Sequence, residues 1–276
     1  MTKQILITCA VAWASAVMPA QAAGDIAWRT NVQTASKTAL PANKPLLIEF
    51  WAAWCPPCKV MDAEVYTDPA VKEAMGKVVP VKVDVDKQED VTRKYDVASM
   101  PTLVFADSYG NELFRFTGTI TADTMTQLLR ELPGDVTNIN RLAQIIAADK
   151  DNVVALENLG RELKAARLFR SSNVYYGRAA RTRGGPDRAN ALGDILIAMG
   201  HNHLELKEFR EAENVFSRYL QEFSGGPAEP DAMLGLGRAL LFQNKRADAK
   251  RTLQTLTGRH KAGPVHDEAA RLLAGL

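Results

Sequence analysis

The sequence changes character at Pro133-Gly134, and this change limits what the chain can fold into. Before that point, short apolar runs typical of buried strands alternate with helical stretches. After it, the hydrophobic residues follow helical periodicity, and no segment has the pattern of a strand. Because 276 residues suffice for two ordinary domains, we expect an α/β domain over residues 23–133 and a helical domain over residues 134–276.

The first segment predicts a mixed sheet with helices on both faces. Its patterns follow the order βαβ, then a hairpin and a closing helix, and Thr121 is placed to cap that helix. We expect strands at Leu46–Trp51, Val78–Val85, Thr102–Ala106 and Leu113–Thr117. We expect helices at Asn31–Leu40, Cys58–Val65, Pro69–Met75, Glu89–Tyr95 and from Thr121 to Leu132.

The second segment contains three self-similar units. Each has a glycine, a small residue twelve positions later and a large residue four positions further on. These triplets are Gly160, Ser172 and Tyr176; Gly200, Ala212 and Phe216; and Gly237, Ala249 and Leu253. The pattern resembles tetratricopeptide repeats, with longer loops than their 34-residue period. Such arrays usually offer a concave surface, so we expect a protein partner there; the alternative is an ordinary helical bundle with chance matches.

The N-terminus has the pattern of a secretory signal peptide. Lys3 gives a positive start, Ile5–Val17 is apolar, and Ala20-Gln21-Ala22 is an A-x-A cleavage site. An uncleaved membrane anchor is the alternative, but a spanning helix needs about 20 apolar residues. We therefore expect residues 1–22 to be a cleaved signal and the mature chain to be periplasmic. Cys9 leaves with the signal, so the mature chain keeps Cys55 and Cys58.

The charge balance argues against a nucleic-acid-binding protein. The net charge of +2 gives no support for nucleic-acid binding. It is the balance of a slightly acidic first domain, with 12 basic and 15 acidic residues, and a slightly basic second domain, with 21 and 17. We read the basic excess as a solvated surface, with an acidic partner as the alternative.

The two remaining cysteines carry the chemistry. Cys55 and Cys58 follow the first buried strand and open a helix, with Pro56 and Pro57 between them. At a helix N-terminus, unpaired backbone N–H groups stabilise a thiolate, which is the nucleophile of thiol–disulfide exchange. We expect Cys55 to attack and Cys58 to resolve the mixed disulfide. A structural disulfide, a zinc half-site and an inert relic of a redox site are the alternatives.

These residues are accompanied by further motifs in a recognisable order. The sequence reads Trp54-Cys55-Pro56-Pro57-Cys58-Lys59, then Val83-Asp84-Val85-Asp86, then Met100-Pro101-Thr102. Residues from about Asp25 to Leu132 thereby resemble a thioredoxin domain. The Asn43-Lys44-Pro45 and Tyr66-Thr67-Asp68-Pro69 stretches look more like periplasmic thioredoxin-like domains, including that of the transmembrane reductant conductor.

The resemblance implies roles for individual residues. Pro101 is expected to be cis, with its loop against the cysteine pair, where the backbone of Met100 pairs with a substrate chain. The residues expected to contact a substrate are Trp54, Pro56, Pro57, Met100, Pro101 and Thr102.

Glu49 stands where the family usually has aspartate, and Lys82 stands where it has a nearby lysine. Strand alternation puts Glu49 on the side of Leu47 and Trp51. If helices cover that side, its pKa rises, and it can exchange a proton with Cys58 through water. A solvent-facing charge pair is the alternative.

The leading hypothesis is a periplasmic protein thiol–disulfide oxidoreductase that uses no metal or organic cofactor. Its partners would be protein thiols and disulfides, a redox partner such as a membrane reductant conductor, and a protein on the repeats. The family's Gly-Pro is Pro56-Pro57 here, and this pair helps set the potential, so the direction of electron flow stays open. Alternatives are a periplasmic chaperone or assembly scaffold, and a reductase for cytochrome c maturation.

Overall fold

The computed structural model describes residues 25–182 and 188–276, without the side chains of residues 188–190. The expected signal peptide lies outside these residues. Within them, no helix is both long and apolar enough to cross a membrane.

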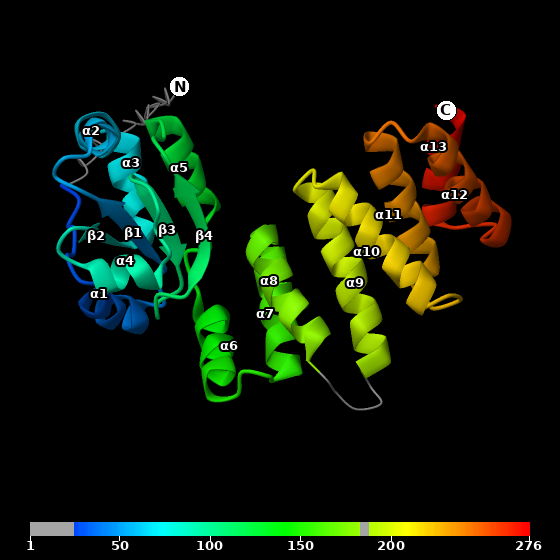
Figure 1. Cartoon of the computed structure of the whole chain (residues 1–276), viewed down its shortest axis with the longest axis horizontal. Helices are drawn as coiled ribbons and strands as arrows, with labels where there is room; N and C mark the ends of the chain where they lie inside the picture. Colours follow the sequence, from blue (N-terminus) through cyan, green and yellow to red (C-terminus); the bar gives the residue numbers. More distant parts are fainter. Residues whose placement is uncertain (1–24, 183–187) are drawn as a thin grey trace, which may run out of the picture.

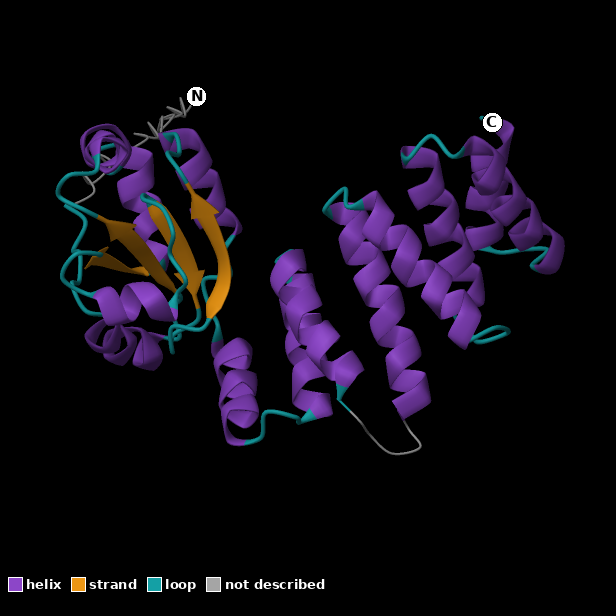
Figure 2. Cartoon of the chain, in the orientation of Figure 1, coloured by secondary structure: helices purple, strands orange, loops and turns teal. Residues whose placement is uncertain are grey.

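A four-stranded sheet forms the centre of the first domain (Figure 2). Its order is β2-β1-β3-β4, in which β1 pairs with β2 in parallel and with β3 antiparallel, and β3 pairs antiparallel with β4. The mixed sheet and the closing hairpin are therefore as the sequence predicts. The strands are β1 (Leu46–Trp51), β2 (Val79–Asp84), β3 (Thr102–Ala106) and β4 (Glu112–Thr117).

Helices cover both faces of the sheet, as expected. One face packs against α1 and the segment around α4, through side chains such as Ala35 and Tyr95. The other face packs against η2, α3 and α5, through side chains such as Met61, Val71 and Met125. The helices are α1 (Val32–Ala39), η1 (Leu40–Ala42), α2 (Pro56–Val60), η2 (Met61–Val65), α3 (Pro69–Ala74), η3 (Met75–Lys77), α4 (Glu89–Lys94) and α5 (Ala122–Glu131).

The second domain consists of helices that follow one another away from the sheet (Figure 1). Three antiparallel pairs, α7 with α8, α9 with α10 and α11 with α12, are flanked by α6 and α13. The helices are α6 (Thr137–Ala148), α7 (Val153–Ala165), α8 (Phe169–Arg181), α9 (Arg188–Glu205), α10 (Phe209–Glu222), α11 (Glu229–Phe242), α12 (Arg246–Arg259) and α13 (Pro264–Ala274).

The glycines of the three units lie where the paired helices touch. A Cβ at Gly160 would be 2.7 Å from the ring of Tyr176, and a Cβ at Gly200 would be 2.5 Å from the ring of Phe216. In the third unit, a Cβ at Gly237 would be 2.6 Å from Leu253. The large residue of each unit therefore fills a place that only glycine leaves open, as the repeat pattern predicts.

The turns inside the three pairs are also equivalent. Each contains one non-glycine residue with a positive φ: Arg167 at 59°, Lys207 at 58° and Asn244 at 60°. These residues are spaced as the three glycines are. The left-handed conformation ends the first helix of each pair, so all three units reverse the chain in the same way.

The first helix of the second domain is fixed to the first domain by buried polar contacts. The N–H of Val136 donates to the carbonyl of Asn43 at 2.9 Å. The side chain of Asn140 accepts from the N–H of Ser108 at 3.2 Å and donates to the Ser108 hydroxyl at 3.0 Å. The hydroxyl in turn donates to the carbonyl of Lys44 at 2.7 Å. These contacts leave the junction little freedom to rotate.

Candidate active site

The two cysteines lie at the start of a helix that follows the central strand. Cys55 is the N-cap of α2, and its Sγ accepts a hydrogen bond from the N–H of Cys58 at 3.2 Å. Pro56 and Pro57 occupy the first turn, where proline's fixed φ suits a helix and its missing N–H costs nothing. Cys55 and Cys58 form a disulfide, and both are almost completely buried.

The predicted start of this helix was two residues late, and the second half of the predicted helix is a π-helical turn instead of an α-helix. We expected one helix over Cys58–Val65, but α2 begins at Pro56 and is followed by a single π-helical turn, η2. In that turn the N–H of Tyr66 donates to the carbonyl of Met61, five residues back. Such turns are frequent at functional sites. This one contains Asp62 and ends at Tyr66, and both side chains lie near Glu49 and Lys82.

The loop before β3 packs against the cysteines. The Met100–Pro101 peptide bond is cis, as the resemblance implies. Met100 lies against the apolar cluster around Cys55 and Cys58, together with Trp51 and Val85. The carbonyl of Pro101 accepts from the N–H of Gly118 at 2.8 Å, which ties the loop to the end of β4.

The residues expected to contact a substrate differ in how they face the solvent. The side chain of Trp54 is 62% exposed, and its Nε1 donates to Asp86 at 2.8 Å, so the ring is held at the surface. Pro56 is also exposed, whereas Pro57 and Met100 are half-buried and Pro101 is buried.

Thr102 faces inward. Its hydroxyl donates to the carbonyl of Ser99 at 2.8 Å and lies 3.3 Å from the hydroxyl of Thr117. The side chain of Thr102 is therefore turned away from the surface, and a substrate contact through its backbone stays a prediction.

Glu49 is buried on β1, on the face of the sheet that η2 and α5 cover. Its Oε2 lies 3.4 Å from Nζ of Lys82, which also pairs with Asp62. Burial raises the pKa of Glu49 from 4.5 to about 7, while the Lys82 charge lowers it and the Asp62 charge raises it. The solvent-facing alternative for Glu49 is therefore wrong, and its carboxyl titrates near neutral pH. Its part in proton transfer stays a prediction.

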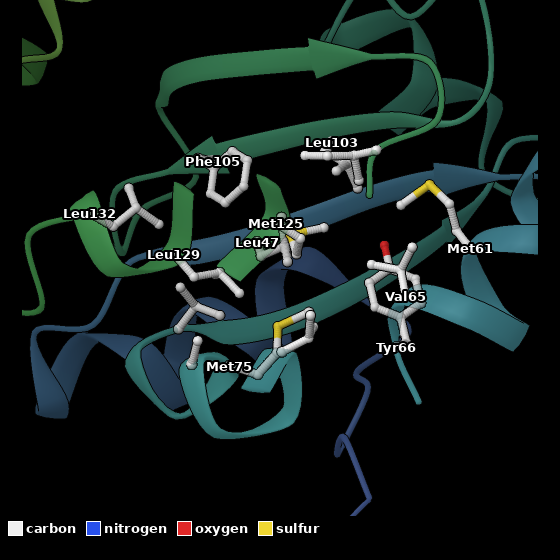
Figure 3. Packing of buried hydrophobic residues seen from close by; sticks show 14 residues of the cluster. Leu47, Met61, Val65, Tyr66, Met75, Leu103, Phe105, Met125, Leu129 and Leu132 are labelled. Atoms are coloured by element: carbon white, nitrogen blue, oxygen red, sulfur yellow. The ribbon is translucent and has the colours of Figure 1, made fainter. Parts of the chain in front are cut away.

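Aromatic rings enclose the Lys82 ammonium, and one of them, that of Trp28, lies outside the motifs and strands that the sequence predicts. Nζ lies 5.0 Å from the ring centroid of Trp28, 5.3 Å from that of Tyr66 and 5.4 Å from that of Trp51. Tyr66 belongs to the core that Figure 3 shows, with its hydroxyl oxygen directed toward the sheet. Asp62 and Tyr66 follow Cys58 by four and eight residues, a helical spacing that offered a signal for both; Trp28 gave none.

A cleft lies between the two domains. Its volume is about 490 Å³. Phe114 and Leu128 line it from the first domain, and Leu168, Phe169 and Leu206 line it from the second. The side chains of β4 and α5 thus form one surface with the first turns of the repeat array.

A buried cysteine pair at a helix start, next to a cis-proline loop, defines a thiol–disulfide exchange centre of the thioredoxin fold. The thioredoxin family model matches residues 27–131, and a tetratricopeptide repeat model matches residues 203–276. The chain belongs to the thioredoxin family through its N-terminal domain. It is a thioredoxin-like oxidoreductase fused to tetratricopeptide repeats.

Relatives match this N-terminal domain. Thioredoxin of Mycobacterium tuberculosis (strain ATCC 25618 / H37Rv) is 41% identical over 102 residues, 37% of this chain and 82% of that protein. Thioredoxin-T of Drosophila melanogaster is 35% identical over 117 residues, 42% of this chain and 72% of that protein. Among solved structures, the C-terminal domain of DsbD from Neisseria meningitidis in the reduced form is 24% identical, with a TM-score of 0.33, over 36% of this chain and 92% of that chain.

Proposed function

We propose that the protein is a periplasmic thiol–disulfide oxidoreductase that exchanges disulfides with protein substrates through Cys55 and Cys58. The observation that carries this proposal is the position of Cys55. Its sulfur caps a helix and accepts the N–H of Cys58, a donor that stabilises a thiolate. The exposed ring of Trp54 and the Met100–Pro101 loop border this sulfur pair and offer a surface for a polypeptide.

In the reducing direction, the Cys55 thiolate attacks a substrate disulfide. A Cys55–substrate disulfide forms, and the first substrate sulfur leaves as a thiolate. Cys58 gives its thiol proton to Glu49 through water, and its thiolate attacks the Cys55 sulfur. The second substrate sulfur leaves and takes up a proton, so the substrate gains two electrons and the protein becomes the disulfide. The oxidising direction is the reverse.

The periplasmic location rests on the signal-peptide pattern of residues 1–22. An oxidising compartment suits a protein whose mature chain keeps only its redox pair of cysteines. Expression of the full chain followed by cell fractionation tests the location, and N-terminal sequencing of the periplasmic product should begin at Ala23. A product that keeps its first residues in the cytosol would contradict it.

Equilibration with glutathione buffers, followed by alkylation of free thiols, tests the chemistry. The wild-type chain should shift between doubly alkylated and unmodified forms as the buffer becomes oxidising. Cys55→Ser should abolish turnover, whereas Lys59→Gln, which keeps both cysteines, should still cycle. If Cys55 does not cycle, the enzymatic function fails.

We also propose that the repeats bind a protein partner, and that the cleft between the domains belongs to this surface. Its apolar lining, with Phe114 facing Leu168 and Phe169, favours a protein segment over a small polar ligand. A Cys58→Ala variant would trap partners as mixed disulfides with Cys55. Recovery of a membrane reductant conductor in this trap would identify the electron donor.

The second candidate function, a chaperone or scaffold built on the repeats, is favoured by the same cleft. A double variant, Cys55→Ala with Cys58→Ala, separates the two. Full rescue of a deletion strain by this variant would favour the scaffold, whereas loss of rescue would favour the oxidoreductase.

A further inference from the structure

A buried hydroxyl next to Glu49 has no partner in this structure. The side chain of Tyr66 is only 5% exposed, and its hydroxyl makes no hydrogen bond. Both carboxyl oxygens of Glu49 are buried and also accept no hydrogen bond, although Oε2 lies 3.4 Å from Nζ of Lys82. A buried polar group without a hydrogen bond is costly, and this hydroxyl and this carboxylate interact electrostatically, so each is the other's available partner.

The Glu49 carboxylate is close enough to this hydroxyl to interact with it electrostatically. Burial first, and the nearby Glu49 carboxylate second, raise the pKa of Tyr66 well above its ordinary value. The phenol therefore keeps its proton and is a donor. The titratable groups around Glu49 are Lys82 on β2, Asp62 on η2 and Tyr66 at the end of η2. Of these, Tyr66 is the one buried neutral donor, and an ionised carboxylate accepts such a donor strongly.

The ring of Tyr66 also forms one wall around the Lys82 ammonium. Its centroid lies 5.3 Å from Nζ, and the ring of Trp28 packs edge-on against it at 4.9 Å. Trp28 forms the outer wall, 5.0 Å from the same Nζ. Rings at these distances attract an ammonium group and keep water from it. The side chain of Lys82 is only 15% exposed as a result.

We propose that Tyr66 is a positioning residue of the redox centre, whose hydroxyl holds the carboxylate of Glu49 when that group is ionised. Together with Trp28, its ring holds the Lys82 ammonium against this carboxylate. Tyr66 thereby sets the pH at which Glu49 exchanges its proton. Neither Tyr66 nor Trp28 belongs to the motifs of the cysteine pair. The role in exchange rests on the oxidoreductase function proposed above.

Titration of the Glu49 carboxyl carbon by ¹³C NMR in the oxidised mature chain tests the proposal, with Glu49→Gln to assign the signal. In Tyr66→Phe the ionised carboxylate loses its donor, so the midpoint should move upward by about one pH unit. Trp28→Leu admits water to the site and also loosens the Lys82 ammonium. Because burial raises the pKa of Glu49 by more than the Lys82 charge lowers it, the entry of water should dominate and the midpoint should move downward.

Tyr95→Phe is the matched control. Tyr95 is also buried, but it lies on the other side of the sheet and donates to the carbonyl of Gly110 at 2.7 Å. Its loss should leave the Glu49 midpoint in place. An unchanged midpoint in Tyr66→Phe, or an equal shift in Tyr95→Phe, would overturn the proposal.

A second readout is the pH dependence of the rate at which the reduced protein reduces oxidised glutathione. The inflection in this pH profile that belongs to Glu49 is the one that Glu49→Gln removes. In Tyr66→Phe it should move to higher pH by the same amount as the NMR midpoint. An inflection that stays at the same pH would overturn the role of Tyr66 in exchange. Absence of exchange at every pH would instead refute the oxidoreductase function, while the NMR midpoint would still decide whether Tyr66 holds Glu49.

Discussion

Replacing Glu49 by glutamine should change how the stability of the first domain depends on pH. Glutamine keeps the shape of the side chain and removes its charge. In the folded protein the pKa of Glu49 is about 7, compared with an ordinary value of 4.5. A rise of this size corresponds to about 3 kcal/mol of differential stability between the two protonation states.

The sign follows from proton binding. Between pH 4.5 and about 7 the unfolded chain has lost the Glu49 proton while the folded chain retains it. The free energy of unfolding therefore falls as pH rises through this window. The wild-type chain should lose about 3 kcal/mol relative to Glu49→Gln across it, with little further change at higher pH.

Urea unfolding followed by tryptophan fluorescence measures this difference. Trp28, Trp51 and Trp54 all lie in the first domain and are the tryptophans of the chain after residue 22, so the signal reports that domain. The disulfide is kept intact throughout. Glu64→Gln is the control, because Glu64 is an exposed glutamate of the same domain, on η2, and its curve should run parallel to wild type. Parallel curves for wild type and Glu49→Gln would refute the reasoning.

Three further predictions concern the repeats, the junction and the substrate surface. Gly200→Ala should lower stability by about 1–3 kcal/mol in denaturation followed by circular dichroism, because its Cβ would lie 2.5 Å from Phe216. Gly258→Ala, with open space around it, should instead raise stability by about 0.5 kcal/mol; equal effects would refute the packing argument. Asn140→Ala removes the partner of a buried N–H, so it should cost about 1–3 kcal/mol and speed amide exchange in α6; unchanged exchange there would contradict a fixed junction. Trp54→Ala should reduce kcat/KM for a protein disulfide about tenfold and leave exchange with glutathione nearly unchanged; equal losses for both would contradict a docking role.

Local patterns predicted a large part of this protein. The strand Leu46–Trp51 was predictable from its residues, because a short run in which five of six residues are apolar is typical of a strand buried on both faces. Thr121 was predictable as a cap, and its hydroxyl does accept the N–H of Thr124. The glycine of each repeat was predictable from spacing, since a close helix pair needs the same small residue in every unit.

Other features depend on segments that are distant in sequence. Trp28 reaches Lys82 because the chain before α1 runs beside β2, where Arg29 forms a bridge with Val81. The ring of Phe216 touches Gly235 of the next unit as well as Gly200 of its own. Neither contact has a local pattern, because each is fixed by how whole elements pack.

The sequence by itself determined the two-domain organisation, the cysteine pair and the repeat units, because periodicity and motif spacing are local properties of a chain. The tertiary structure decided that Glu49 is buried next to one lysine shared with Asp62, and that Tyr66 and Trp28 enclose that lysine. The burial of Glu49 and the charges around it depend on neighbours that come from several strands and helices. The proton affinity of this site therefore emerges only when the strands and the helices that cover them are assembled.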